Sequence, residues 1–260
     1  MSEAASVPTY PELAGRVAFV SGGSKGIGAA ACRVLAANGV RVAVNARSAP
    51  GIDAVVDELR ADGADAVGVA GDCTSPADVA RARAEAEAAL GPVDILLPFA
   101  GGFDAFTPVA EIGDEEWHRV IDANLTSTFL SVREFVPGMM ERRRGAIVTM
   151  ASNAGRYLDK LTTASYAAAK AGVVQFTRHV AIELGPHGIR VNSIAPATVL
   201  TERVERIMDD EARERVAGMS PLGRLGTAQD CALATLFLVS DSAAWMTGVT
   251  LDVAGGRIMM

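Results

Sequence analysis

Tyr166 and Lys170 are the pair of residues best placed for chemistry, four positions apart in an alanine-rich stretch from Thr162 to Leu184. If this stretch is helical, residues four apart lie on one face, so the phenol and the amine point the same way. A free tyrosine titrates near ~10, and a neighbouring positive charge lowers that pKa toward the range useful for acid–base catalysis. On ordinary helices the same spacing gives a half-buried ring beside a solvated amine. Lysine is scarce here, occurring only at positions 25, 160 and 170, which favours the catalytic interpretation.

A glycine-rich segment near the start of the chain is typical of a dinucleotide-binding loop. Residues 17–20 are apolar and predict a strand, residues 21–28 read Ser-Gly-Gly-Ser-Lys-Gly-Ile-Gly, and residues 29–37 predict a helix. In this order the backbone can approach a pyrophosphate, which binds at the positive end of the helix. An ordinary tight turn between a strand and a helix is the alternative.

The residues that follow the second predicted strand bear on the choice of cofactor. This strand, residues 40–46, ends in Asn45-Ala46 and is followed by Arg47-Ser48, with no carboxylate. An acid at this point accepts the ribose hydroxyls of NAD, whereas an arginine accommodates the 2′-phosphate of NADP. Together with Lys25 in the glycine loop, this favours NADP(H) over NAD(H). Arg47 as a solvated turn residue is the alternative.

Strands and helices alternate through all 260 residues, which predicts one α/β domain with a doubly wound, mostly parallel, seven-stranded Rossmann-type sheet and helices on both faces. One long helical pattern runs from Asp114 to Arg143 and is expected to be interrupted near Pro137-Gly138. Asp72 follows the third predicted strand, where it can accept from an adenine amino group or cap the helix beginning near Ser75-Pro76. A polar, helix-prone segment at about 199–221 is expected to form a lid over the site, with a surface excursion as the alternative.

Composition excludes several classes of function. The formal charge is -7 and the pI is near 5.1, which argues against nucleic acid as the main partner. No apolar run reaches the ~20 residues of a membrane span, and the first residues lack a secretory signal, so we expect a cytoplasmic protein. Three widely spaced cysteines fit reduced thiols rather than a metal site.

The chain as a whole resembles the short-chain dehydrogenase/reductase family, in its single-domain branch. The motifs that carry the resemblance are residues 21–28, Asp72, Ala100-Gly101, Asn124-Leu125, Ser152, Tyr166-x-x-x-Lys170, and residues 191–196 with Thr201. The resemblance implies that Tyr166 is the proton donor to a carbonyl, that Lys170 holds the nicotinamide ribose, that Ser152 binds the substrate oxygen and that Asn124 holds a relay water. It implies cofactor contacts from Gly22, Ser24, Lys25, Gly26, Ile27, Gly28, Arg47, Ser48, Asp72, Cys73, Ala100, Gly101, Pro196, Val199 and Thr201, besides Tyr166 and Lys170.

Three positions depart from the family's pattern. Pro98-Phe99 replaces a pair of asparagines, so packing must replace a hydrogen-bonding brace. Pro196-Ala197 replaces Pro-Gly, which leaves less room near the nicotinamide. Ser152 precedes Tyr166 by one residue more than in close relatives, so the loop at 155–163 is expected to bulge.

The resemblance implies an NADP(H)-dependent reductase of a ketone such as a 3-oxoacyl thioester. An alcohol, sugar or steroid dehydrogenase is the nearest alternative, and a catalytically silent dinucleotide-binding sensor is a distant one. Apolar residues suggest an apolar substrate, although they can equally be core: Val199, Leu200, Val204, Ile207, Met208, Phe103 and Phe106. By the same resemblance we expect a homotetramer.

Overall fold

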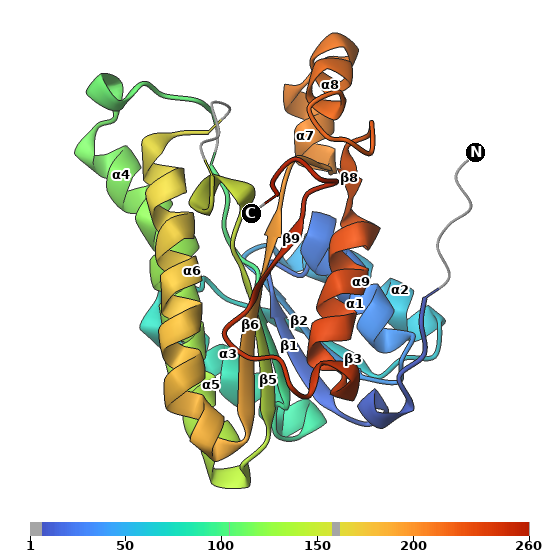
Figure 1. Ribbon diagram of the computed structural model, residues 1–260. Coiled ribbons are helices and arrows are strands. Elements are labelled where there is room, and N and C mark those ends of the chain that lie inside the picture. The colour runs from blue at the N-terminus through green and yellow to red at the C-terminus, as the bar shows by residue number, and fades with distance from the viewer. Residues whose placement is uncertain (1–6, 104, 158–161, 260) are drawn as a thin grey trace.

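Seven parallel strands form the central sheet of the computed structural model, in the order β3-β2-β1-β4-β5-β6-β9 (Figure 1). The structure describes residues 7–103, 105–157 and 162–259. The strands are β1 (Val17–Ser21), β2 (Arg41–Ala46), β3 (Ala66–Ala70), β4 (Ile95–Pro98), β5 (Gly145–Met150), β6 (Ile189–Pro196) and β9 (Thr250–Val253). The predicted doubly wound parallel sheet is confirmed.

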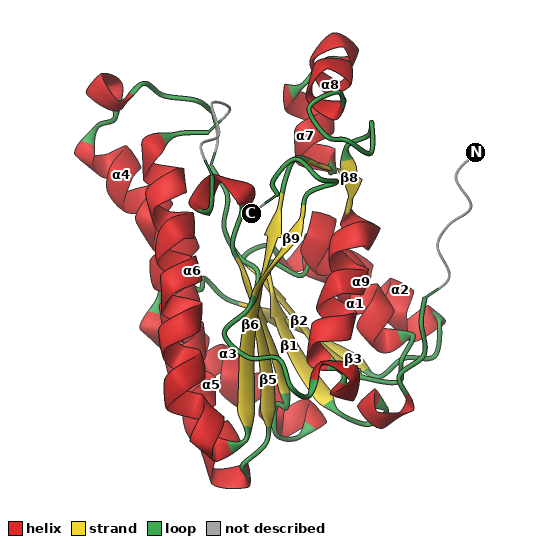
Figure 2. Cartoon of the chain, viewed as in Figure 1, coloured by secondary structure: helices red, strands yellow, loops and turns green. Residues whose placement is uncertain are grey.

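Helices cover both faces of this sheet (Figure 2). One layer contains α1 (Gly26–Ala36), α2 (Ala49–Ala61) and α9 (Ala228–Val239), and the other contains α3 (Pro76–Leu90), α5 (Ser127–Arg142) and α6 (Ala164–Leu184). In β1, Ala18 and Val20 pack with the first layer, whereas Val17 and Phe19 pack with the second. Because both faces are covered, the strands read as continuous apolar runs rather than as alternating ones.

The chain reverses its direction of winding between β1 and β4, which are neighbours in the sheet. At the carboxyl ends of these two strands, the backbone N–H of Ala100 donates to the Ser21 hydroxyl at 3.2 Å. The loop after β4 therefore lies against the glycine loop after β1. In open α/β sheets, the crevice outside such a reversal point is where ligands bind.

The long helical pattern is interrupted at a different place from the one predicted. Helix α4 (Asp114–Ile121) passes through a π-helical turn at Asp122–Thr126 into α5, and Pro137 lies inside α5. The Asn124 amide donates to the carbonyl oxygen of Val120 at 2.8 Å, so it competes with the backbone N–H groups for this acceptor and widens the turn. The predicted break at Pro137-Gly138 was wrong: Pro137 is exposed, so water can satisfy the carbonyl that lost its donor.

The segment at 199–221 rises above the carboxyl edge of the sheet (Figure 1). It contains β7 (Val199–Leu200), which pairs with β8 (Gly226–Thr227), and the helices α7 (Glu202–Ile207) and α8 (Asp210–Ala217). No residue of α7 is buried, and Val216 is the one buried residue of α8. The segment is thus held by few packing contacts. The short strand pair was not predicted, because two-residue strands are too short for a periodic pattern.

Short 3-10 turns complete the fold at Pro11–Leu13, Val109–Glu111, Asn153–Gly155, Gly185–His187 and Asp241–Ala243. Within the described ranges, no helix has the length and apolar character needed to cross a bilayer, and no three His, Cys, Asp or Glu side chains are grouped as metal ligands.

Candidate active site

Tyr166 and Lys170 lie together on the first two turns of α6. The helix is capped by Thr163, whose hydroxyl accepts from the backbone N–H of Tyr166 at 3.2 Å. The Lys170 Nζ atom lies 5.5 Å from the centroid of the Tyr166 ring. The spacing of four residues therefore brings phenol and amine to one place, as the sequence predicted for a helix.

Burial controls the charge of Lys170. Only 2% of this residue is exposed, and its Nζ donates to the carbonyl oxygen of Met150 at 2.7 Å. Loss of water disfavours the ammonium form and lowers the pKa of Lys170 from 10.5 to about 7. In the protein alone, the positive charge expected beside Tyr166 is therefore fully present only below this pH.

Ser152 stands at the end of β5, in a turn that packs against α6. Its hydroxyl accepts from the backbone N–H of Ala154 at 3.2 Å and donates to the Asn153 side chain at 3.1 Å. The turn approaches α6 so closely that a Cβ atom on Gly155 would overlap the backbone of Lys170. Glycine at this position thus lets the Ser152 turn lie directly against the helix that carries Tyr166.

Asn124 is fully buried and ties the loop after β4 to the π-helical turn. Its Oδ1 accepts from the backbone N–H of Gly102, and its Nδ2 donates to the carbonyl oxygen of the same residue, both at 2.8 Å. The backbone carbonyl of Asn124 accepts from the Thr128 hydroxyl at 2.9 Å and retains a second lone pair. The side chain therefore positions the loop, and a relay water at the backbone oxygen stays a prediction.

The glycine loop has the shape of a phosphate cradle. Gly22 and Gly26 have positive φ angles of 67° and 51°, which favour glycine. A Cβ atom on Gly28 would overlap the carbonyl oxygen of Gly22. The side chain of Lys25, the N-cap residue of α1, makes no capping hydrogen bond, so the first N–H groups of this helix are left for a ligand. These features fit a dinucleotide pyrophosphate.

Lys25 and Arg47 are both exposed beside this loop. In the part of the chain that the structure describes, neither side chain has an ion-pair partner. Ser48 begins α2 without a side-chain cap, and the Cβ atom of Ser24 lies 3.3 Å from the Cβ position of Gly51 in the first turn of α2. These residues border the space next to the end of β2, where a ribose would lie in this fold.

Asp72 does not cap α3, which corrects one of the two interpretations of this residue. The cap is Ser75, which accepts from the backbone N–H of Asp78 at 3.3 Å. The Oδ1 atom of Asp72 instead accepts from the backbone N–H and the hydroxyl of Thr74, at 2.9 and 2.8 Å. Next to it, burial raises the pKa of the Cys73 thiol to about 11, so this cysteine is an unreactive core residue.

The first residues of the 199–221 segment reach the glycine loop. The Cγ2 atom of Thr201 lies 3.2 Å from the Cβ position of Gly26, and Val199 is buried at the base of the segment. Pro196 is the last residue of β6, so it stands at the same edge of the sheet. The structure thus brings Thr201 next to the loop after β1 and places Pro196 at the same edge of the sheet.

Two further residues stand at the site. Neither was selected from the sequence as a catalytic or cofactor-binding residue. The Phe103 ring, which the sequence suggested only as apolar lining, lies 4.6 Å from the Tyr166 ring. The guanidinium of Arg203 lies 5.2 Å from the Phe103 ring. The sequence signal for Arg203 was its position two residues after Thr201, in a run of charges typical of a solvated helix.

The departures from the family's pattern have structural counterparts. Phe99 is buried and packs into the core next to α1, and Pro98 pairs with Ser21 in the sheet, so packing replaces the expected brace. Within the loop expected to bulge, residues 158–161 lie outside the described residues.

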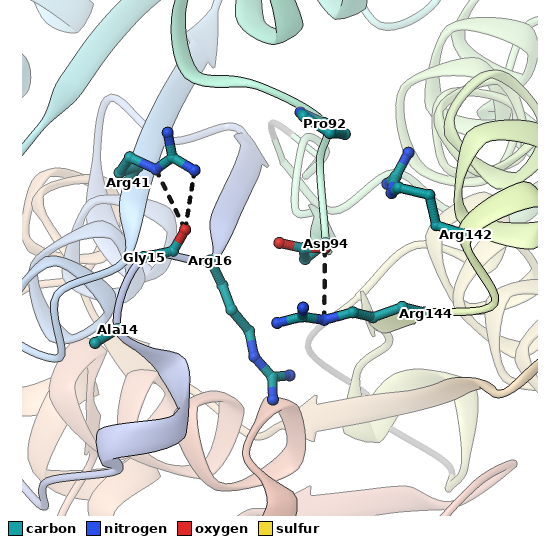
Figure 3. Close-up of a pocket in the computed structure, with 8 residues that line it drawn as sticks. All are labelled: Ala14, Gly15, Arg16, Arg41, Pro92, Asp94, Arg142 and Arg144. Atoms are coloured by element: carbon teal, nitrogen blue, oxygen red, sulfur yellow. Dashed lines mark hydrogen bonds and ion pairs between the residues drawn. The ribbon is translucent and has the colours of Figure 1, made fainter.

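A pocket of about 490 Å³ lies at the opposite edge of the sheet (Figure 3). It is lined by Ala14, Gly15, Arg16, Arg41, Pro92, Asp94, Arg142 and Arg144. Arg41 donates to the carbonyl oxygen of Gly15 at 3.0 Å, Arg142 donates to the carbonyl oxygen of Val93 at 2.6 Å, and Arg144 lies 3.7 Å from Asp94. These arginines bond to the segments that lead into β1 and β4. We therefore assign them a structural role and not a catalytic one.

Comparison with known proteins agrees with this geometry. A family model described as enoyl-(acyl carrier protein) reductase matches residues 22–257. The chain belongs to the short-chain dehydrogenase/reductase family and is an oxidoreductase of that family.

Individual relatives match over nearly their whole length. The 3-oxoacyl-(acyl-carrier-protein) reductase FabG of Escherichia coli is 39% identical over 246 residues, which are 95% of this chain and 98% of the relative. The 3beta-hydroxysteroid dehydrogenase 1 of Eggerthella lenta is 36% identical over 252 residues, 96% of each chain. A crystal structure of a 3-oxoacyl-(acyl-carrier protein) reductase with bound NAD from Brucella melitensis has a TM-score of 0.90 and 31% identity, covering 100% of this chain and 99% of that one.

Proposed function

We propose that the protein uses NADPH to reduce a ketone to a secondary alcohol, and that 3-oxoacyl thioesters are the substrate class that its relatives support best. The observation that carries the proposal is the contact between Tyr166 and the buried Lys170, next to the turn that holds Ser152. These groups lie at the carboxyl edge of the sheet, the edge that also carries the glycine cradle.

The residues divide the reaction between them. When bound, the cofactor supplies a hydride to the carbonyl carbon. Tyr166 donates its phenolic proton to the carbonyl oxygen, and the Ser152 hydroxyl donates a hydrogen bond to the same oxygen as negative charge develops there. Lys170 binds the nicotinamide ribose and stabilises the phenolate that remains on Tyr166.

Replacing Tyr166 by phenylalanine tests the role of the phenol. The variant should lose ketone reduction while it retains NADPH binding, because the ring and its contact with Phe103 are kept. NADPH binding by fluorescence and NADPH oxidation by absorbance measure the two properties. Activity that survives the change would refute the role of the phenol, and a wild-type protein that binds NADPH but reduces no ketone would point to the dinucleotide-binding sensor.

The preference for NADP over NAD is supported by Lys25 and Arg47, two exposed cations without ion-pair partners among the described residues. At the end of β2 stands Asn45, which is buried and donates to the carbonyl oxygen of Val69 at 2.9 Å, so no carboxylate there is available for a ribose. We expect the Arg47→Ala variant to weaken NADPH binding by about tenfold, with NADH binding unchanged. A wild-type preference for NADH would refute this proposal.

The substrate class requires a panel of ketones. The E. lenta relative is named as a steroid dehydrogenase, so a 3-ketosteroid and its alcohol stand beside a 3-oxoacyl thioester as the second candidate. An enoyl thioester belongs in the same panel, because the matching family model is described by that reaction. The highest kcat/KM identifies the class, and a clear preference for the steroid would overturn the thioester assignment.

We further propose that the segment at 199–221 is a lid. It has few buried residues, and at its base Thr201 contacts the glycine loop, so a bound cofactor can be covered by it. Hydrogen exchange should slow in α7 and α8 on addition of NADPH. Unchanged exchange in these helices would refute the role of a lid.

A homotetramer is supported by aromatic residues on the outer layer of helices. Phe129 on α5 is 41% exposed, contacts Phe176 on α6 at 6.3 Å between ring centroids, and lies under the guanidinium of Arg133. We expect a tetramer in sedimentation experiments and smaller species for Phe129→Asp; a monomeric wild type would refute the proposal.

The three buried free thiols support a reducing, cytoplasmic location.

A further inference from the structure

Arg203 lies at the entrance to the candidate active site. It is on α7, directly after the start of the 199–221 segment, and its guanidinium carbon is 5.2 Å from the centroid of the Phe103 ring. The Phe103 ring is in turn 4.6 Å from the ring of Tyr166. A single aromatic ring therefore separates this cation from the phenol proposed to protonate the substrate.

Arg203 lies against the loop after β4, at Gly102. A Cβ atom on Gly102 would overlap the Nη1 atom of Arg203, and Gly102 has a φ angle of 135°, which disfavours any side chain. The Asn124 side chain forms hydrogen bonds with both the N–H and the carbonyl of Gly102. The guanidinium thus lies against Gly102, whose backbone Asn124 holds in place.

Among the residues that the structure describes, none balances the charge of Arg203. Arg213, on the neighbouring helix α8, pairs with Asp210 at 2.9 Å and donates to the carbonyl oxygen of Glu205. Arg203, by contrast, has neither an ion pair nor a hydrogen bond anywhere in the described ranges. The adjacent acid, Glu202, extends toward the glycine loop instead, 3.9 Å from the Cβ position of Gly26. A partly buried guanidinium usually has an anionic partner.

We infer that Arg203 binds an anionic group of the substrate, so that the enzyme prefers ketones that carry a carboxylate near the reacting carbonyl. This inference rests on the proposed function, because it takes the carbonyl to be at Tyr166. The Tyr166 ring lies 4.6 Å from the Phe103 ring, which lies 5.2 Å from the guanidinium carbon. The guanidinium carbon therefore lies at most about 10 Å from the Tyr166 ring, the value reached if the three groups stand in line. Small oxo acids have this size, and the planar guanidinium matches a carboxylate with two parallel hydrogen bonds.

The inference keeps the proposed reduction of a ketone but replaces the 3-oxoacyl thioester, which the names of the relatives support, by a free oxo acid. In a carrier thioester the group next to the 3-oxo carbonyl is neutral, and the nearest phosphate lies at the far end of the pantetheine arm. Arg203 therefore favours a free oxo acid over a thioester for this chain. The competing role for Arg203 is a contact with a cofactor phosphate, because α7 starts where Thr201 touches the glycine loop.

The test compares oxo acids with their methyl esters in the wild type and in Arg203→Met. The probes are 3-oxobutanoate, 4-oxopentanoate and 5-oxohexanoate, each with its methyl ester, and the control variant is Arg206→Met, an exposed arginine on the same helix. In the wild type we expect at least one acid to exceed its ester in kcat/KM. In Arg203→Met, kcat/KM for that acid should fall about ten- to a hundredfold, the effect of losing charge-assisted hydrogen bonds, while the esters and the dissociation constant of NADPH stay unchanged. Arg203→Lys should restore part of the loss.

The outcomes separate the inference from the proposed function. Reduction of esters and thioesters without any preference for an acid, or an equal fall for acid and ester in Arg203→Met, overturns the inference alone. Weaker NADPH binding in Arg203→Met assigns the guanidinium to the cofactor and also overturns it. A wild type that reduces no ketone of either panel overturns the proposed function, and the inference with it.

Discussion

Lys170 links the electrostatics of the site to a stability that can be measured. In the folded protein its pKa is lowered by burial from 10.5 to about 7, whereas the unfolded chain keeps the ordinary value. Between these two pH values the unfolded state binds more protons, so the free energy of unfolding rises with pH across this window. Each pKa unit corresponds to about 1.4 kcal/mol, so the burial of Lys170 lowers the free energy of unfolding by about 4 kcal/mol at pH 7 and by about 1 kcal/mol at pH 9.5.

The Lys170→Met variant isolates this effect, because methionine has a similar length and no charge. Urea unfolding without cofactor should show the wild type gaining about 3 kcal/mol relative to the variant between pH 7 and pH 9.5. The lost hydrogen bond to Met150 is present at both pH values and cancels in this comparison. The same comparison between the wild type and Lys25→Met, which removes an exposed lysine, should give a stability difference that does not vary with pH. A difference between wild type and Lys170→Met that does not vary with pH would mean that the ammonium persists beside Tyr166 throughout this range, and would refute the reasoning.

Two further predictions concern the groups that shape the site. Gly28→Ala should lower the free energy of unfolding by more than about 2 kcal/mol and abolish NADPH binding, because the new methyl group overlaps the carbonyl oxygen of Gly22; Gly185→Ala, where the Cβ position has no atom within 4 Å, is the control in thermal unfolding and fluorescence titration. Asn124→Leu should lose about 3 kcal/mol in urea unfolding, because the N–H and carbonyl of Gly102 lose their buried partner. Wild-type stability in either variant would show that the corresponding contact is dispensable.

The sheet could be predicted from the sequence because its signal is local. Each strand is a short apolar run between turn residues. Because both faces of the sheet are covered, the strands need no alternation of apolar and polar residues to be recognised. The pair of Tyr166 and Lys170 was predictable for the same reason, since helical geometry alone brings residues four apart together.

Features that depend on contacts between distant segments were not predictable in this way. The helical pattern was expected to break at Pro137, yet it widens at Asn124, whose side chain bonds to Val120 within the turn and also to Gly102, 22 residues earlier in the chain. Arg203 looked like part of a solvated helix, and its position over Phe103 appears only when α7 is placed above the loop after β4. Both features lie at the site, where local preference is overruled by contacts made across the crevice.

The charges of the site lead to a last prediction, on proton uptake. Lys170 is buried and has no carboxylate partner among the described residues, and at pH 8 a group with a pKa of about 7 is mostly neutral. We have proposed that the nicotinamide ribose binds this amine, and hydroxyl oxygens that accept from an ammonium favour its charged form. Binding of NADPH at pH 8 should therefore draw a fraction of a proton from solution, about 0.9 at most. Titration calorimetry in buffers of different ionisation enthalpy measures this uptake. It should be absent in Lys170→Met and should decline in the wild type as the pH is lowered below 7, where the amine already holds its proton. Equal uptake in wild type and variant would place the titrating group elsewhere and leave Lys170 without its assigned contact to the ribose.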